Sequence, residues 1–396
     1  MFHRSGYLLL PFAFFLLSRT GFAQLSVGGL DGRDAVITTG VPFLAISPDA
    51  RSAGMGDVGA AISPDANSVY WNPAKLAFLE PTIGVSGSFT PWLSNVVSDM
   101  SISYLTGYKK INEGQTLALA MRYFDLGDIQ LTDIQGNPLQ LVSPREFALG
   151  ATYAMKLSEK FSAGLTARFI HSNLLTGTTN ANGSSGKPGI SAAADIAVYY
   201  TSPVVLGAKE GTWSFGADLS NIGPKITYLT DSTADFLPTN LRLGTALTTN
   251  LDPFNKLTFA LDFSKLLVPT PTRDTTTGLI NTHNDKGLLS GMFGSFSDAP
   301  GGFSEELKEF MIAAGIEYWY NDLFAVRTGY FHENRDKGAR QYFTAGIGLR
   351  YQVFGVDFAY LLPVKTNNPL QNTLRITLHF ILDNPDAEEV DIAPDR

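Results

Sequence analysis

The sequence predicts an all-β fold, namely an antiparallel transmembrane β-barrel of fourteen strands. Only 17% of the 396 residues are charged, against about 25% in an average soluble domain. Beyond residue 20 no apolar run is long enough to cross a bilayer as a helix, which takes roughly 20 residues. Apolar and polar residues instead alternate along segments of about ten residues, the length with which a tilted strand crosses a bilayer.

Residues 1–23 have the features of a signal peptide. A short basic region precedes an apolar stretch from Tyr7 to Leu17, and Gly21-Phe22-Ala23 provides small residues before the predicted cleavage at Gln24. An apolar stretch of this length is too short to span a bilayer. The sequence therefore predicts export from the cytoplasm.

Residues 24–81 do not alternate, although they are rich in apolar residues. Pro, Gly, Asp and Asn interrupt this segment, and a short helix is predicted near Asn67 to Leu79. Such a segment fits the lumen of the barrel or its periplasmic mouth. We expect residues 24–81 to form an N-terminal plug or periplasmic segment, and residues 82–382 to form the barrel.

The strands are predicted from alternation with a period of two. In 115–124, Leu117, Leu119 and Met121 point to one face and the polar or small residues point to the other, because successive side chains of a strand face opposite sides. The even number of strands agrees with bacterial single-chain barrels. The predicted strands are 82–90, 98–108, 115–124, 145–156, 161–172, 189–200, 212–221, 239–249, 256–265, 310–320, 323–331, 340–351, 353–361 and 372–382.

The connections between these strands alternate in length. Bacterial barrels have long outer loops and short periplasmic turns. The acidic, proline-containing tail 383–396 is predicted to be a disordered periplasmic end. We therefore expect an outer-membrane location, with loops at the cell surface and both termini in the periplasm. The outward connections are 91–97, 125–144, 173–188, 222–238, 266–309, 332–339 and 362–371, and the inward ones are 109–114, 157–160, 201–211, 250–255, 321–322 and 352.

Charged residues recur on the polar face of the predicted strands, six of each sign. An Arg on the lipid face would cost about 2–4 kcal/mol near the midplane, so these residues are expected in the lumen. The balance of signs predicts a bracing salt-bridge network rather than an ion-selective pore. Aromatic residues near strand ends, including Tyr104 and Tyr108, are expected at the membrane interfaces. The lumen charges are Arg122, Glu146, Arg168, Asp195, Asp218, Arg242, Asp262, Glu317, Arg327, Arg350, Asp357 and Arg375.

Two outward loops, 91–97 and 266–309, carry clustered apolar residues, with glycine beside those of the second loop. Clustered apolar residues in loops indicate contact with cargo or another protein. The alternative is that they fold over the barrel mouth as a lid. The residues concerned are Trp92, Leu93, Leu288, Leu289, Met292, Phe293 and Phe296.

Two segments of the plug carry a family resemblance. Residues 69–76, Val-Tyr-Trp-Asn-Pro-Ala-Lys-Leu, resemble the Asn-Pro-Ala segment of FadL-type channels, which are plugged fourteen-stranded barrels. Residues 43–59, from Phe43 to Gly59, resemble the signature of the PorV/PorQ branch of that superfamily. From about Gly40 to the last strand the chain is similar to this branch, and loop 266–309 makes it more similar to the PorV (LptO) family. The motif residues are Pro48, Asp49, Arg51, Gly54, Met55, Gly56, Asp57, Asn72 and Pro73.

This resemblance implies a component of the type IX secretion system of Bacteroidetes. Such proteins bind the C-terminal signal domain of cargo at the giant translocon barrel and deliver the cargo to the surface sortase and attachment complex. The implied partners are these proteins and outer-membrane lipid. The alternatives are a FadL-like channel for small hydrophobic molecules, favoured by an apolar path past the plug, and a lipid A deacylase.

No catalytic, cofactor or metal residues are predicted. Gly54 to Gly59 matches the G-x-G-x-x-G spacing, but the strand and helix that a dinucleotide site requires are not predicted beside it. The chain lacks a G-x-S-x-G elbow and has no cysteine. Its scattered histidines, His332 and His379 among them, share no metal-ligand spacing. The net charge of -8 makes nucleic acid an improbable partner.

Overall fold

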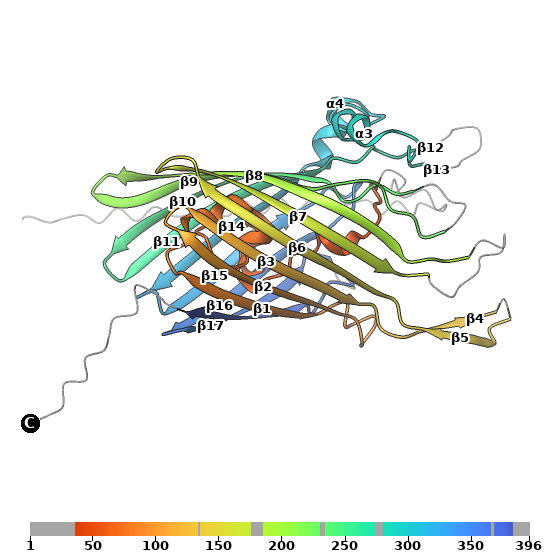
Figure 1. The fold of residues 1–396 in the computed structure, drawn as a ribbon, viewed down its shortest axis with the longest axis horizontal. Helices are drawn as coiled ribbons and strands as arrows, with labels where there is room; N and C mark the ends of the chain where they lie inside the picture. The colour runs from red at the N-terminus through yellow and green to blue at the C-terminus, as the bar shows by residue number, and fades with distance from the viewer. Residues whose placement is uncertain are drawn as a thin grey trace, which may run out of the picture. The chain divides into compact units, whose positions relative to one another are not determined.

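The computed structural model describes residues 36–133, 135–175, 185–229, 234–273, 280–365 and 368–382. The predicted signal peptide, residues 24–35 of the predicted plug and the predicted tail lie outside these ranges. Fourteen antiparallel strands close into a barrel (Figure 1), which confirms the predicted fold class. Among the described residues, no helix is long and apolar enough to cross a membrane.

Each barrel strand pairs with its chain neighbour among the barrel strands, and β1 closes the barrel on β18, with Ile83 opposite Leu382. Side chains alternate between the lumen and the outer surface because strand residues point to opposite faces. The barrel strands are β1 (Ile83–Pro91), β2 (Ser101–Asn112), β3 (Gln115–Asp125), β6 (Arg145–Lys156), β7 (Phe161–Asn173), β8 (Gly189–Leu206), β9 (Lys209–Ile222), β10 (Asn240–Asp252), β11 (Asn255–Leu266), β14 (Met311–Tyr320), β15 (Phe324–His332), β16 (Gln341–Tyr351), β17 (Phe354–Pro363) and β18 (Leu374–Leu382).

One predicted connection is wrong. The structure continues β8 and β9 through 201–211 as a hairpin, and Gly207 takes a positive φ of 66° in the two-residue turn. Pro203 lies within this hairpin, opposite Thr212 near its tip. The pattern also missed two short hairpins in loops, β4 (Ile129–Thr132) with β5 (Pro138–Val142), and β12 (Thr272–Arg273) with β13 (Ile280–Asn281).

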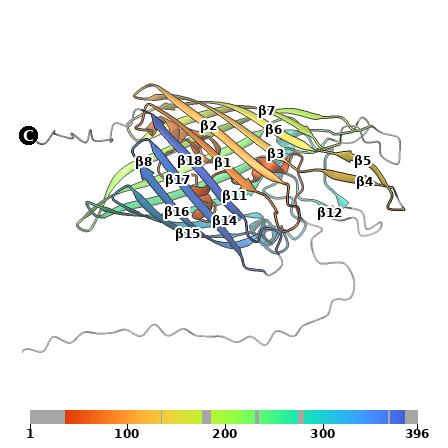
Figure 2. The same cartoon turned by 90° about the horizontal axis from the view of Figure 1, so that it is seen from below.

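The two ends of the barrel differ, as Figures 1 and 2 show. At one end, here called the turn end, short turns join the strands. At the other, the loop end, the β4–β5 hairpin extends from the barrel. The longest loop, 267–310, carries α3 (Leu288–Gly294), α4 (Phe303–Glu306) and the 3-10 helix η4 (Leu307–Glu309).

Residues 36–79, here called the inner segment, lie inside the barrel (Figure 1). They contain η2 (Pro42–Ala45), α1 (Ala50–Gly54), α2 (Ser68–Trp71) and η3 (Pro73–Phe78). The helix predicted over 67–79 is interrupted at Asn72, which is extended with φ -167° and ψ 98°. A residue before proline is disfavoured in the helical region, so Pro73 divides the helix.

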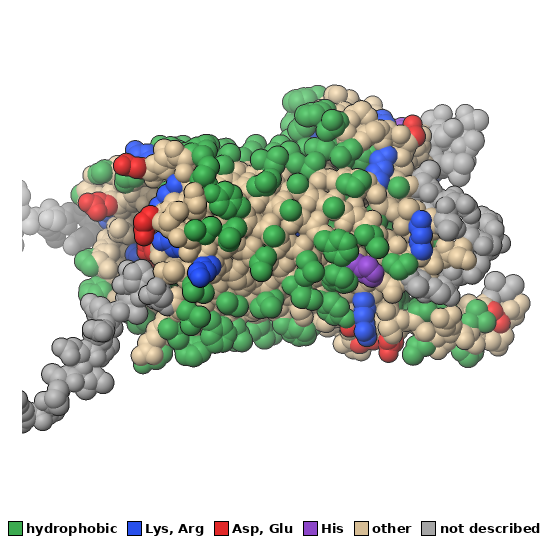
Figure 3. Space-filling model, in the orientation of Figure 1, with side chains coloured by type: hydrophobic (Ala, Val, Ile, Leu, Met, Phe, Trp, Pro, Cys, Tyr) green, Lys and Arg blue, Asp and Glu red, His purple; other side chains and the backbone are tan. Residues whose placement is uncertain are grey.

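The outer surface of the barrel is hydrophobic around its middle, as Figure 3 shows on one face. Leu119, Phe259 and Phe343 are among its exposed side chains. Two aromatic residues depart from the expected interfacial position. Tyr104 and Tyr108 are buried and point into the lumen, in the same alternation as Thr106.

Candidate functional site

Inward-facing glycines bring the wall and the inner segment into direct contact. A Cβ atom on Gly329 would lie 2.1 Å from the carbonyl carbon of Met55, and one on Gly216 would lie 2.1 Å from the oxygen of Ala60. Real Cβ atoms do not approach so closely, so only glycine fits. These glycines were not among the predicted site residues, although glycine in the inward phase of several strands was a readable signal. The wall glycines that approach the segment are Gly164, Gly216, Gly244, Gly315, Gly329 and Gly346.

A chain of buried charges joins α1 to the wall. The guanidinium of Arg51 donates to Glu317 over 3.0 and 2.8 Å, and Arg327 donates to the same carboxylate over 2.6 Å. Arg327 also bonds Asp357 over 2.8 Å. Charge-assisted bonds of this kind are shorter and stronger than neutral ones, so α1 is tied to β14, β15 and β17.

Asp357 gathers three partners in the same network. Arg350 donates to it over 2.7 Å, and Nε2 of His379 lies 2.7 Å from its Oδ2. His332, in contrast, points to the outer side of the wall, beside the ring of Tyr330. The two histidines therefore face opposite sides of the wall and cannot form one catalytic site.

A second set of predicted lumen charges lies across the barrel. Arg168 pairs with Asp195 over 2.6 Å, and Arg242 lies 3.9 Å from Asp218. Asp262 accepts the backbone N–H groups of Gly59 and Ala60 over 2.8 and 2.9 Å. These charges therefore hold both the wall and the inner segment.

Three further lumen charges have other partners. Arg122 donates to the carbonyls of Phe43 and Leu44 over 2.8 and 2.9 Å. Arg375 donates to Asp57 over 3.0 Å, and Glu146 accepts from Ser172 over 2.5 Å. Two of these three contacts again join the wall to the inner segment.

Several motif residues shape the inner segment itself. Asp49 caps α1, accepting from the N–H of Ser52 over 2.9 Å, and also accepts from the indole of Trp71 over 2.6 Å. Asn72 accepts from Ala74 over 3.0 Å and donates to the carbonyls of Ala60 and Val198. Capping residues of this kind satisfy amides that the helix leaves unpaired. The resemblance therefore falls on residues that fix the local fold.

The remaining motif residues lie just before α1, at its last residue and at the bend that follows it. Pro48, Gly54 and Met55 are buried. Gly56 and Asp57 take positive φ angles of 75° and 65°. A Cβ atom on Gly56 would lie 2.6 Å from the backbone nitrogen of Tyr330, which reserves this position for glycine.

Burial shifts the titration of two groups in the inner segment. Desolvation lowers the pKa of Lys75 to about 8, although Asp65 acts in the opposite direction. Its amine donates to the carbonyl of Gly59 over 2.7 Å. Desolvation also raises the pKa of Asp49 above its ordinary value, because burial disfavours the charged form.

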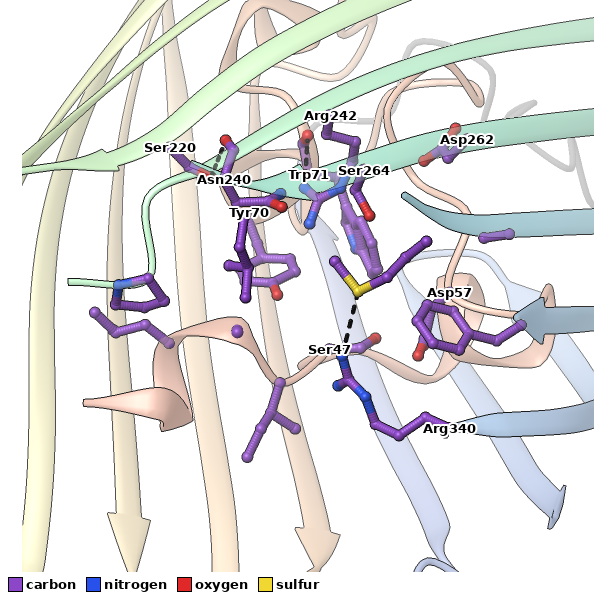
Figure 4. Close-up of a pocket in the computed structure, with 18 of the residues that line it drawn as sticks. Ser47, Asp57, Tyr70, Trp71, Ser220, Asn240, Arg242, Asp262, Ser264 and Arg340 are labelled. Carbon is purple, nitrogen blue, oxygen red and sulfur yellow. Dashed lines mark hydrogen bonds between the residues drawn. The ribbon is translucent and has the colours of Figure 1, made fainter. Parts of the chain in front are cut away.

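A cavity of about 120 Å³ lies between the inner segment and the wall (Figure 4). Arg242 and Asn240 lie on one side of it, and Asp57 and Arg340 on another. Within the described part of the chain, the buried Oδ1 of Asn240 and the Oγ of Ser47 have no hydrogen-bond partner. Apolar residues complete the lining, among them Leu44, Ile46, Trp92, Leu266, Phe331 and Leu361.

A second cavity, of about 480 Å³, shares Ile46, Trp92 and Arg340 with the first. We call this second cavity the vestibule. Arg340 is held there by Glu333, with bonds of 2.8 and 2.9 Å. Trp92 belongs to the loop after β1, and Arg340 to the loop before β16. The two cavities are therefore adjacent, and the vestibule lies toward the loop end.

The predicted contact residues separate into two places. Trp92 and Leu93 are half-buried, and Trp92 lines both cavities. On α3, Leu288 is half-buried and Met292 is buried, whereas Leu289 and Phe293 are exposed, as is Phe296 just after the helix.

Phe303 and Leu307, which were not among the predicted contact residues, are also exposed. They lie on α4 and η4, beside the same loop residues. The double glycine before Phe303 interrupted the apolar pattern and concealed them. With them, the exposed apolar residues of this loop form a larger set than the sequence predicted.

A family model described as "Type IX secretion system protein PorV" matches residues 31–273. A search of curated proteins finds no match. Among solved structures, the chain is similar to the Ralstonia pickettii toluene transporter TbuX, with 10% identity, 84% of this chain and 98% of that chain covered, and a TM-score of 0.44. The Pseudomonas putida toluene transporter TodX is 10% identical, with 87% of this chain and 97% of that chain covered and a TM-score of 0.47. A Pseudomonas aeruginosa FadL homologue is 11% identical, with 85% of this chain and 98% of that chain covered and a TM-score of 0.42. We draw no functional conclusion from likenesses at these identities and TM-scores.

Proposed function

Because the chain belongs to the PorV family of type IX secretion system proteins, we propose that it carries cargo between two machines of that system. It is an outer-membrane component of the system, as its family and its barrel together indicate. In the proposed role it binds the C-terminal signal domain of cargo at the giant translocon barrel. It then delivers the cargo to the sortase and attachment complex, with its loop end at the cell surface.

The packing of the inner segment inside the barrel is the observation that favours a carrier over a pore. Glycine contacts join this segment to six strands of the wall, and Arg51 ties it to the buried charges. Next to the turn end, Leu76 and Ala77 pack against Ala118 and Ala154 in one buried cluster. We propose that the segment acts as a plug, so that cargo binds outside the barrel rather than passing through it.

The vestibule is the proposed contact region for cargo. Trp92 offers a large apolar side chain at this place, and Leu93 lies next to it. Aromatic residues and arginine are enriched in the residues that dominate protein interfaces. Arg340, fixed by Glu333, adds a positive group that lines the same cavity.

A native pull-down tests this proposal. The protein is tagged at its C-terminus, extracted in mild detergent and analysed by mass spectrometry. The expected partners are a giant barrel, a sortase, and cargo that retains its C-terminal signal. Purification of the barrel alone, with bound lipid or fatty acid, would contradict the carrier role.

The apolar lining of the lumen cavity favours a second candidate, a channel for small hydrophobic molecules. Leu44, Phe331 and Leu361 could contact such a ligand. The buried contacts of Leu76 and Ala77 toward the turn end count against passage. Uptake of a radiolabelled fatty acid into proteoliposomes, compared with protein-free liposomes, distinguishes the two functions.

A further inference from the structure

We propose that α3, α4 and η4 form an anchor that inserts its apolar face into the membrane leaflet on the loop-end side. The segment 287–310, here called the projection, contains these helices. Phe293 and Phe303 are 71% and 77% exposed, so most of the surface of each side chain is not covered by the protein. The exposed set comprises Leu289, Phe293, Phe296, Phe303 and Leu307.

The projection is firmly held, so its exposed residues do not result from a loose loop. Lys265 of β11 is buried, donates to Glu306 over 3.1 Å and pairs with Glu309. Lys337, in the loop before β16, donates to the same Glu309 over 2.9 Å. Ion pairs from a wall strand and from a neighbouring loop therefore fix the base of α4 and η4.

The base of α3 is fixed by packing. Met292 is buried, and a Cβ atom on Gly291 would lie 2.8 Å from the ring of Phe236. One face of the helix therefore lies against the loop before β10. The opposite face carries Leu289 and Phe293 away from the protein.

The position of the projection indicates that its exposed apolar side chains contact lipid. Figure 1 shows α3 and α4 beside the barrel wall, not beyond its mouth, and Figure 3 shows hydrophobic side chains of the projection next to the hydrophobic belt. The loop leaves β11 just after the exposed Phe263 and enters β14 just before the exposed Ile312. Its apolar surface therefore continues the surface that contacts the bilayer.

The charges of the projection do not oppose this placement. Glu305 pairs with Lys337 over 2.6 Å, Lys308 with Asp336 over 2.8 Å, and Asp298 with Lys286 over 3.4 Å. Glu306 and Glu309 are paired with Lys265, as described above. An interfacial helix inserts its apolar face about 5–10 Å into the boundary between headgroups and acyl chains, and every charged side chain of the projection has an ion-pair partner.

Site-directed fluorescence tests the proposal, because the chain has no native cysteine to interfere with labelling. Phe293→Cys and Phe303→Cys are labelled with an environment-sensitive fluorophore and reconstituted in liposomes. Asn137→Cys, on the exposed β4–β5 hairpin, provides the water-exposed control, and Phe259→Cys, on the outer wall, provides the lipid-exposed control. Heat-modifiable mobility in gels confirms that each variant has a folded barrel.

We expect both projection labels to be quenched by a nitroxide placed near the lipid headgroups and protected from iodide, as the Phe259→Cys label is protected. Iodide quenching as strong as that of the Asn137→Cys label would overturn the proposal. Protection that arises only in the native complex, and not in liposomes, would also overturn it and would assign the projection to a protein partner.

Discussion

Loss of the Glu317 carboxylate should weaken the attachment of the inner segment to the wall. This carboxylate is buried and accepts three charge-assisted bonds, two from Arg51 and one from Arg327. Each such bond contributes about 1.5–3 kcal/mol, and removal of one member of a buried pair costs about 3–5 kcal/mol. Arg51 retains Asp65, and Arg327 retains Asp357. We therefore expect Glu317→Leu to lower the free energy of unfolding by about 3 kcal/mol, the lower end of that range.

The assay is equilibrium unfolding of the detergent-solubilised barrel in guanidinium chloride, followed by tryptophan fluorescence. The exposed pair of Lys256 and Asp322 is the matched control, since its 2.7 Å separation is similar but its side chains contact solvent. Asp322→Leu should cost no more than about 1 kcal/mol, because solvent screens an exposed pair. Equal losses for the two variants would refute the reasoning, since burial would then not decide the strength of the pair.

Three further predictions follow from the inner segment and the vestibule. Gly329→Ala should lower the midpoint of thermal unfolding and raise conductance in planar bilayers, because the added Cβ would clash with Met55. Gly87→Ala is the control and should change neither quantity, because the atom nearest to its added Cβ would be 3.9 Å away. Burial lowers the pKa of Lys75 to about 8, so the folded state favours the neutral amine, and stability should rise with pH from about 8 toward the ordinary value of 10.5. Lys75→Met should flatten that rise in unfolding midpoints measured between these pH values. Trp92→Ala should reduce recovery of cargo in the pull-down by roughly tenfold, as for one dominant interface residue, without changing the midpoint of unfolding by more than a few degrees.

Alternation along the chain was sufficient to predict all fourteen barrel strands, because the wall is one strand thick and separates lipid from lumen. Each side chain therefore faces one of two contrasting environments, and a pattern such as Leu117, Leu119 and Met121 records which one. The pattern failed at 201–211, where the β8–β9 hairpin continues without a clear alternation of environment. In that hairpin each strand is extended by pairing with the other, and the sequence of one segment does not reveal its pairing partner.

The inner segment was harder to predict, because its contacts join residues far apart in the chain. Arg51 and Glu317 are separated by 266 positions, and nothing in either local sequence specifies the other as its partner. Inward-phase charges such as Glu317 and Arg327 could be identified, but not which of them would meet the segment. The inward phase of Gly329 could likewise be read from the strand, but not its contact with Met55.

The apolar loop residues show a different limit. The composition of loop 266–309 indicated exposed apolar residues, but the fold of the loop determines which of them are exposed. Met292 lies on the buried face of α3, whereas Phe293 on the same helix is exposed. Adjacent residues on a short helix face different directions, and the direction depends on how Gly291 and Met292 of α3 pack against the loop before β10.

The carrier role is tested most directly by photo-crosslinking in secreting cells. A photoreactive amino acid is placed at Leu93, in the loop beside the vestibule, and at Glu113, which is almost fully exposed at the turn end. The account predicts adducts from position 93 with cargo that retains its C-terminal signal, and no such adducts from position 113. The absence of cargo adducts from position 93 while secretion continues, or equal adducts from both positions, would contradict it.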